Sequence, residues 1–332
     1  MKSLQCIAIL ALLAALVLAQ STTARMDGTV TDPSGALVAG AEIVVTDTLT
    51  GRMLQAFSDS RGHWVIPAVP NGTYKVKVTA KGFRTTIFES VKVDTGVPAT
   101  VNASLELGAV AEVVEVAAGA ELVQTTSATV ASTIQGRQIF ELPFTSRNPL
   151  ELLVTQAGSQ TGTTVRNTFI NGLPFSAINI TVDGINTMDN YYKSGDGFFT
   201  VIPIRSDSVE EVTLTTSAAG AESTAQGAAQ IKFVTKGGTN EYHGGAFWQH
   251  RNTALNANYY FNNINGLPRD RLILNQGGTR VGGPILKNKL FFFSNFEIYR
   301  IPATSAATRT VMNPDAQNGI FTYNDSAKAV KT

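Results

Sequence analysis

The chain has 332 residues, 15% of them charged, and a formal net charge of +1 at pH 7. A near-zero charge without any Lys/Arg cluster excludes the basic surface typical of nucleic-acid-binding proteins. The only cysteine, Cys6, precedes the first apolar run, so the rest of the chain has no thiol for disulfides or cysteine-based metal sites.

The first 24 residues follow the order of a secretory signal peptide. Lys2 precedes an apolar run from Ile7 to Leu18, and small residues follow it. The run is too short for a membrane-spanning helix, which needs about 20 apolar residues. We therefore predict export, with cleavage after Ala19 or Ala24.

Short strands alternate with turn signals throughout residues 25–107. Stretches such as DPSG, DSRG and PNG recur, and residues 74–80 alternate apolar side chains with Lys and Thr. This pattern predicts an antiparallel β-sandwich of about seven strands. Trp64 and Phe57 are the side chains expected at the centre of its core. The segment resembles the carboxypeptidase regulatory-like domain, which is a non-catalytic, prealbumin-like sandwich in that family.

Residues 108–132 form a linker that is expected to be extended. It contains EVVEVA at residues 112–117, which resembles the TonB box, the short peptide by which outer-membrane receptors are pulled. Val113, Val114, Glu115 and Val116 are the residues expected to contact TonB, because a Val-rich extended peptide can add to an exposed sheet edge. An ordinary edge strand of the neighbouring sandwich is an equally open interpretation.

Residues 133–236 mix helical and strand patterns. Apolar residues at helical spacing between Ile134 and Leu153 are interrupted by Pro143 and Pro149. Further on, NGLPFSAINITVDGINTMDN predicts a strand and a turn at Asp183–Gly184, while SVEEVTLTTS and AAQIKFVTKGG predict two more strands. Short helices, strands and Gly-rich loops together predict an α+β domain.

Three strands are predicted after residue 237, at Tyr242–Arg251, Ile273–Val281 and Lys289–Tyr299. In the third, positions 290, 292, 296 and 298 form an apolar face, and positions 295 and 297 make the opposite face polar. We expect the second and third strands to pair as a hairpin, with the reversal marked by Gly283–Pro284 and Lys287–Asn288. The apolar face suits either lipid or a protein core, and the length of about 9–11 residues suits a transmembrane barrel strand.

Several segments resemble those of the Oar-like TonB-dependent outer-membrane receptors and appear in the same order. They include ELPFTSRN, TVDGINTMDN, QIKFVTKGGTNEYHGGAFWQHRN and NQGGTRVGGPILKNKLFFFSNFEIYR. The resemblance implies a mainly β chain with the sandwich at 25–107, an α+β plug domain at 133–236 and the first strands of an incomplete outer-membrane β-barrel at 237–332. Such a barrel needs about 22 strands, so we expect the N-terminal piece of a longer receptor, with a truncated gene product as the alternative.

The same resemblance implies active uptake across the outer membrane. A small or oligomeric substrate would bind plug and barrel loops, and TonB with its inner-membrane complex would supply work from the proton gradient, so no cofactor is expected. The ligand-facing plug-loop candidates are Asn171, Leu173, Phe175, Asn190, Tyr191 and Tyr192. The sandwich would lie on the periplasmic side, and the barrel strands would contact outer-membrane lipid.

The sequence contains no recognisable catalytic or metal-binding motif. Asp183, Asp189 and Asp196 lack the spacing of a Ca²⁺ loop. Glu210 and Glu211 are adjacent, so on a strand they would point to opposite faces rather than form an acid–base pair. We therefore predict neither an enzyme nor a metal site. The alternative function is an exported binding or adhesion protein, with carbohydrate as one candidate ligand.

Overall fold

The computed structural model describes residues 22–108, 113–116, 127–136, 138–139, 147–161, 168–174, 177–188, 200, 204–217, 229–304, 312, 314–321, 323–324 and 330–331. The predicted signal peptide lies outside these residues except for its last three positions. The chain divides into two compact units, one made of residues 1–245 and 280–295 and the other of residues 246–279 and 296–332.

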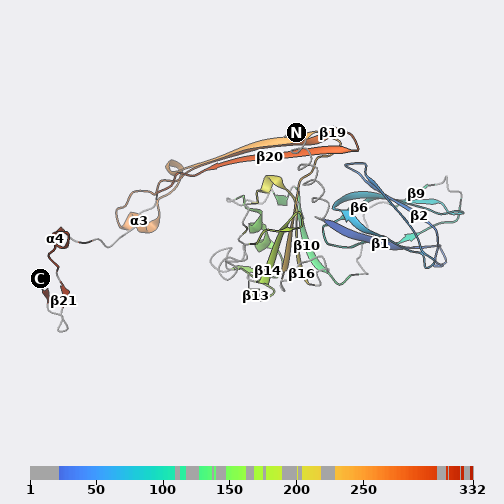
Figure 1. The fold of residues 1–332 in the computed structure, drawn as a ribbon, viewed down its shortest axis with the longest axis horizontal. Coiled ribbons are helices and arrows are strands. Elements are labelled where there is room, and N and C mark those ends of the chain that lie inside the picture. The colour runs from blue at the N-terminus through green and yellow to red at the C-terminus, as the bar shows by residue number, and fades with distance from the viewer. Residues whose placement is uncertain are drawn as a thin grey trace, which may run out of the picture. The chain divides into compact units, whose positions relative to one another are not determined.

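The first part of the chain is a β-sandwich, drawn in blue to cyan in Figure 1. One sheet has the order β4-β1-β7, with β8 also paired to β1, and the other has the order β3-β2-β5-β6-β9. In chain order the strands are β1 (Thr23–Thr31), β2 (Glu42–Asp47), β3 (Met53–Phe57), β4 (His63–Pro70), β5 (Gly72–Thr79), β6 (Thr85–Val93), β7 (Ala99–Thr100), β8 (Ala103–Ser104) and β9 (Val113–Val116). The predicted sandwich is confirmed, and Val113–Val116 adds a strand at the edge of the second sheet.

Side chains from both sheets of the sandwich fill one core. Met26 and Trp64 from the first sheet are buried together with Ile43, Tyr74 and Val76 from the second. The strands carry these residues at alternate positions, so each sheet buries one face. Trp64 therefore lies where the sequence predicts it.

The prediction of Phe57 as a core residue is wrong. Its side chain is 61% exposed because it shares the outward face of β3 with Met53. The residues of β3 that pack against the core are Leu54 and Ala56, at the alternate positions. The side on which a strand residue points, rather than its size, decides its burial.

Aspartate-led turns join strands of the sandwich where the sequence predicts them. Between β3 and β4, the Asp59 carboxylate accepts the backbone N–H groups of Arg61 at 2.8 Å and His63 at 2.9 Å. Gly62 has a φ of +65°, and a Cβ there would lie 2.6 Å from the Val30 carbonyl oxygen, so the turn requires glycine. The bonds from His63 and Arg61 also lower the pKa of Asp59.

A second core belongs to a sheet of order β10-β16-β17-β14-β15, hereafter the middle sheet. Its strands are β10 (Val130–Gln135), β14 (Ile178–Val182), β15 (Ile185–Asn186), β16 (Val209–Ser217) and β17 (Ala229–Thr235). Neighbouring strands are antiparallel except β14 and β17, which are parallel. The predicted strands in NGLPFSAINITVDG, SVEEVTLTTS and AAQIKFVTKGG are confirmed, and so is the turn after Val182, where Asp183 has a φ of +49°.

The stretch predicted as helical contains both helix and strand among its described residues. The 3-10 helix η2 (Pro149–Thr155) begins after Asn148, whose side chain accepts the Leu150 N–H at 3.1 Å. Ile134, which the helical spacing included, lies in β10, because pairing with β16 outweighs the local pattern. A small sheet of β11 (Ser159–Thr161), β12 (Thr168–Ile170) and β13 (Leu173–Pro174) follows η2.

The last long strands form a sheet of order β18-β19-β20. They are β18 (His243–Asn252), β19 (Ile273–Leu286) and β20 (Leu290–Arg300), each overlapping a predicted strand. The short elements described after residue 252 are η6 (Thr253–Leu255), α3 (Tyr260–Ile264), α4 (Pro314–Gln317), β21 (Tyr323–Asn324) and β22 (Val330–Lys331). None of the helices in the described ranges is long and apolar enough to cross a membrane.

The predicted reversal at Gly283–Pro284 is wrong, whereas the one near Lys287–Asn288 is confirmed. Strand β19 continues to Leu286, and the turn follows it, with Asn288 at a φ of +60°. Gly283 serves close packing rather than a turn, because a Cβ there would lie 2.3 Å from the ring of Tyr242. The Tyr242 hydroxyl also donates to the Pro284 carbonyl at 2.9 Å.

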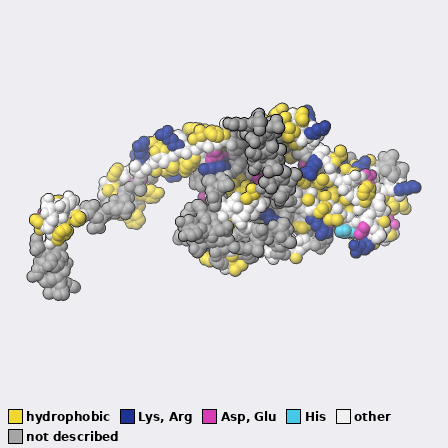
Figure 2. All heavy atoms as spheres, viewed as in Figure 1, with side chains coloured by type: hydrophobic (Ala, Val, Ile, Leu, Met, Phe, Trp, Pro, Cys, Tyr) yellow, Lys and Arg dark blue, Asp and Glu magenta, His cyan; other side chains and the backbone are white. Residues whose placement is uncertain are grey.

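The two faces of β20 differ as the sequence predicts. Leu290, Phe296 and Ile298 are exposed, Phe296 to 62%. On the other face, Glu297 accepts a hydrogen bond from the Gln276 amide at 2.6 Å. Figure 2 shows hydrophobic side chains exposed along the sheet that contains β19 and β20. A row of exposed apolar side chains on one strand face suits contact with lipid.

Candidate functional site

The predicted TonB-contact residues form strand β9 at the edge of the sandwich. Residues 85–88 of β6 pair in parallel with residues 113–116, and Thr86 lies opposite Val114. Among the described strands, none pairs with the other side of β9. The interpretation of this segment as an edge strand is therefore what the structure shows, and its role in TonB contact stays a prediction.

Strand β9 pairs with β6 through its backbone. Of its side chains, Val113 is 53% exposed and Val114 is half-buried. It has four residues, and parallel pairs are slightly less stable per residue than antiparallel ones. Its pairing with β6 is consequently shorter than the pairing of β5 with β6.

Two of the six ligand-loop candidates lie among the described residues. Asn171 has a φ of +51°, and its N–H donates to the Gly158 carbonyl at 2.9 Å in the turn between β12 and β13. Leu173 begins β13 and is partly exposed. The other candidates lie outside the described residues: Phe175, Asn190, Tyr191 and Tyr192. The structure brings Asn171 and Leu173 onto one turn, and the ligand role of the set stays a prediction.

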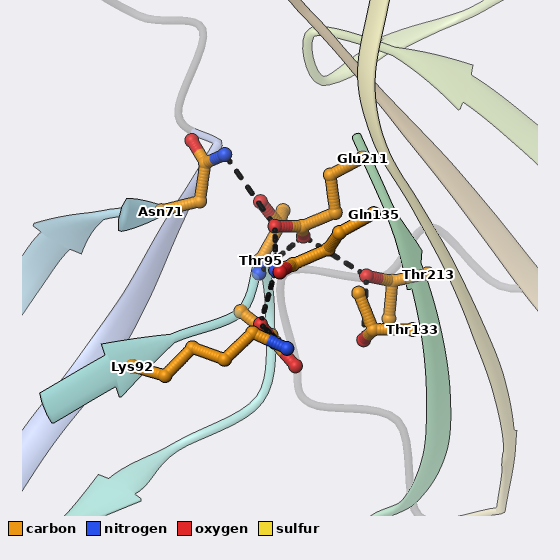
Figure 3. A network of polar contacts seen from close by, with 8 residues as sticks. Asn71, Lys92, Thr95, Thr133, Gln135, Glu211 and Thr213 are labelled. Atoms are coloured by element: carbon orange, nitrogen blue, oxygen red, sulfur yellow. Dashed lines mark hydrogen bonds and ion pairs between the residues drawn. The ribbon is translucent and has the colours of Figure 1, made fainter. Parts of the chain in front are cut away.

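A polar network that the sequence did not reveal joins the sandwich to the middle sheet (Figure 3). Its centre is Glu211 of β16, which is 1% exposed. One carboxylate oxygen accepts the Thr95 backbone N–H at 2.8 Å and the Thr213 hydroxyl at 3.0 Å. The other oxygen accepts the side-chain amides of Asn71 at 3.4 Å and Gln135 at 3.2 Å. Four donors from the two cores thus converge on one carboxylate.

A second carboxylate, Asp94, extends this network on the sandwich side. It accepts a hydrogen bond from Gln135 at 2.7 Å and pairs with Lys92 at 3.4 Å. Burial raises the pKa of Glu211 and the charge of Asp94 raises it further, although the Thr95 N–H opposes this change. The contact between the two cores therefore contains a carboxyl group that protonates more readily than an exposed glutamate.

The sequence predicts the orientation of the two adjacent glutamates but not the partners of Glu211. Glu210 is exposed and Glu211 is buried, so they do point to opposite faces of β16. The available signal was a polar row at positions 211, 213 and 215 opposite the apolar positions 212 and 214. A strand with one apolar and one Glu/Thr face indicates a polar contact on the second face. Nothing local specifies that Asn71 and Thr95 supply it.

A charged cluster connects β19 to the segment before β16. Asp207, in the 3-10 helix η5 (Ser206–Ser208), is buried and forms ion pairs with Arg147 and Arg280. The Ser206 hydroxyl donates to the Arg147 carbonyl at 2.8 Å. Burial, together with the nearby Arg280 charge, lowers the pKa of Lys236 to about 8. Two guanidinium groups thus compensate one buried carboxylate, which would be costly to leave unpaired.

The described residues contain no group of three or more His, Cys, Asp or Glu side chains that could hold a metal ion. Asp183, considered above for a Ca²⁺ loop, instead accepts the N–H of Thr235 at 2.9 Å and its hydroxyl at 2.8 Å. These bonds fix the turn that follows β14 to the end of β17. Asp189 and Asp196 lie outside the described residues.

Two domain families match parts of the chain. Residues 25–106 match the carboxypeptidase regulatory-like domain, and residues 234–332 match an outer membrane beta barrel domain. The second match covers all three strands of the β18-β19-β20 sheet. The chain is therefore a mainly β protein that combines a regulatory-like sandwich with outer-membrane barrel sequence.

The chain is 26% identical over 302 residues to the TonB-dependent transporter Oar of Myxococcus xanthus. The match covers 84% of this chain and 27% of that relative, so the chain spans about a quarter of the relative's length. The resemblance to TonB-dependent receptors predicted from the sequence is confirmed.

Several solved structures resemble parts of the chain, among them a receptor and a dioxygenase. The siderophore receptor PirA from Acinetobacter baumannii is 19% identical, with a TM-score of 0.38, over 51% of this chain and 24% of that one. Wild-type catechol 1,2 dioxygenase from Acinetobacter radioresistens is 17% identical, with a TM-score of 0.22, over 27% of this chain and 53% of that one.

Proposed function

We propose that the chain is the N-terminal part of a TonB-dependent outer-membrane receptor that takes up a substrate from outside the cell. The observation that carries the proposal is the exposed apolar face of β20, within a segment that matches an outer membrane beta barrel domain. Similarity to a TonB-dependent transporter over 84% of the chain supports it. An exported adhesion protein is not favoured, because it gives no reason for the barrel match.

The parts of the chain take the following roles in this proposal. Residues 133–236 are the plug, and loops near Asn171 and Leu173 face the substrate. Residues 113–116 receive the pull from TonB and its inner-membrane complex, while the sandwich lies on the periplasmic side. Energy comes through this partner from the proton gradient, so the proposed cycle requires no nucleotide, metal or catalytic side chain in the chain.

Cell fractionation tests the proposed location. The natural reading frame, carrying an epitope tag, is expected in the outer membrane and should resist extraction by alkaline carbonate, because barrel strands contact lipid. A tagged protein recovered in the soluble periplasmic fraction would overturn the receptor proposal and support the adhesion alternative.

The start of β1 also determines which signal-peptide cleavage site we propose. Ala24 is buried in the sandwich and lies opposite Val69 in the β1–β4 pairing, where it follows Thr23. Cleavage after Ala24 would remove both residues from β1, whereas cleavage after Ala19 leaves the strand intact. We expect the mature protein to begin at Gln20, which mass spectrometry of its N-terminal peptide can check. A mature protein beginning at Arg25 would contradict this choice.

A further inference from the structure

One face of the β18-β19-β20 sheet changes from apolar to polar near the start of β19. Trp248 is 68% exposed there, and a Cβ on Gly277 would lie 2.4 Å from its ring. Two positions further along β18 and two positions back along β19, His250 Nδ1 and Asn275 Oδ1 are 2.8 Å apart. Residues two positions apart on a strand point to the same face. His250 and Asn275 therefore share the face of Trp248.

Arg300 extends this polar pair onto β20. Leu272 forms an antiparallel bridge with Ala303, so three positions further along the pair Asn275 lies opposite Arg300. The backbone bond that closes the turn after β19 has the same register. Opposite side chains of an antiparallel pair share one face, which here is the exposed apolar face of β20 that includes Phe296. His250, Asn275 and Arg300 thus form one row across three strands, hereafter the polar row.

The polar row offers hydrogen-bond donors and a positive charge. Its face consists of the even-numbered residues of β18 and β20 and the odd-numbered residues of β19, all of them described, and it contains no Asp or Glu. Arg300 is exposed, and its guanidinium forms no ion pair with a described residue. When His250 donates through Nδ1 to Asn275 Oδ1, the NH2 group of Asn275 remains a donor. This chemistry fits an anion.

The polar row lies where the hydrocarbon of the membrane is expected to end. Asn275 and Ile285 are ten positions apart on β19, and Ile285 is 59% exposed at the other end of the same face. A barrel strand crosses the hydrocarbon in about 9–11 residues. The turn after β19 is short, whereas residues 253–272 form a longer connection between β18 and β19, and outer-membrane barrels have their longer loops outside. The row therefore belongs to the outer boundary.

We propose that the polar row binds the phosphate headgroup of a lipid in the outer leaflet of the outer membrane. This inference rests on the proposed receptor function and adds a lipid ligand to it. The planar N–H groups of Arg300 match phosphate oxygens, and the Asn275 amide adds a donor. The acyl chains lie along the apolar side chains below the row, among them Trp248 and Phe296. A lipid uses both parts of this face, whereas a free phosphate ion uses only the row.

Photo-crosslinking measures occupancy at this position. In the natural reading frame, Trp248 is replaced by the photoreactive residue benzoylphenylalanine, and the receptor is purified from outer membranes in detergent. Labelled phosphatidic acid, a lipid with a phosphate monoester, is titrated and crosslinked. Arg300→Gln should raise the concentration for half-maximal crosslinking by about 10- to 100-fold, because it removes hydrogen bonds to a charged group. Arg300→Lys, which keeps the charge but not the paired N–H groups, should give an intermediate increase.

Arg251→Gln is the matched control. Arg251 follows His250 on β18 and therefore points to the opposite face of the sheet, so crosslinking should be unchanged. An equal loss in Arg251→Gln and Arg300→Gln would show general attraction to positive charge and would overturn the site. Displacement of the labelled lipid by an equal concentration of inorganic phosphate would also overturn it, because the row would then hold a free ion.

The same preparations separate this inference from the proposed function. If Arg300→Gln is recovered in the outer membrane and crosslinks the lipid as the parent protein does, the headgroup site is wrong and the receptor proposal stands. If the parent protein is recovered only in the soluble periplasmic fraction, the receptor proposal fails and the lipid site falls with it.

Discussion

Replacing Glu211 by alanine should loosen the contact between the sandwich and the middle sheet. The change removes the acceptor of the Thr95 N–H and of three side-chain donors. The bonds at 2.8 Å and 3.0 Å are the strongest of the four by distance, and a bond to a charged group is worth about 1.5–3 kcal/mol. Removal of a buried charge offsets part of this loss.

We expect a net cost of about 2 kcal/mol for Glu211→Ala, which corresponds to about a 30-fold change in a local opening equilibrium. Amide hydrogen exchange of the peptide that contains Thr95 reports this opening directly, because Glu211 accepts the Thr95 N–H. Protection of that amide should fall by about 10- to 100-fold, while amides in β5 keep their protection.

Glu210→Ala is the matched control for this prediction. It removes a carboxylate from the adjacent position, but Glu210 is exposed on the opposite face of β16. Exchange at Thr95 should be unchanged in this variant. Unaltered exchange at Thr95 in Glu211→Ala, or an equal effect of both variants, would refute the network as the contact that holds the two cores together.

Three further predictions concern pH, the core and the lipid-facing strand. Because the pKa of Glu211 is raised, its charge destabilises the contact fully above the folded-state pKa and not at all below the ordinary value of 4.5. Relative to Glu211→Gln, the wild-type contact should therefore strengthen as the pH falls from neutrality towards 4.5. A pH-independent difference in Thr95 protection between the two proteins would contradict this. Trp64→Ala should lower the unfolding free energy of the sandwich by about 3–5 kcal/mol in urea titrations, whereas Phe57→Ala, at an exposed position, should lower it by less than about 1 kcal/mol. Similar losses in the two variants would show that Trp64 is not the core residue of the pair. Phe296→Arg should destabilise a lipid-facing strand by about 2–4 kcal/mol and so reduce the amount of receptor recovered in the outer membrane. Asn295→Asp, on the other face of the strand, should leave this amount unchanged. Equal recovery of the two variants would argue against lipid contact.

Strand positions were the most predictable part of this fold. Alternation of apolar and polar side chains predicts β5, β16 and β20, because each strand has two unlike surroundings. The same rule explains the error at Phe57, since the size of an aromatic side chain does not determine on which side of β3 it lies. The local composition of Gly283–Pro284 predicts a turn, whereas in the structure the glycine makes room for the Tyr242 ring.

The candidate site was less predictable because its contacts depend on residues that are far apart in sequence. Glu211 and Thr95 are separated by 116 positions, and no local pattern indicates that they meet. The same holds for β9, whose parallel pairing with β6 uses backbone groups that every sequence shares. The side-chain pattern of EVVEVA predicts an extended segment, but it cannot select the sheet edge that receives it.

Strand β6 takes part in two contacts at once, and this has a mechanical consequence. Its beginning carries β9, and the two residues after its end, Asp94 and Thr95, bond to Gln135 and Glu211 of the middle sheet. Tension applied to residues 113–116 would enter the sandwich through β6 and reach strands β10 and β16 across this junction. The sandwich would then carry part of the force from residues 113–116 to the middle sheet, in parallel with the covalent chain between β9 and β10.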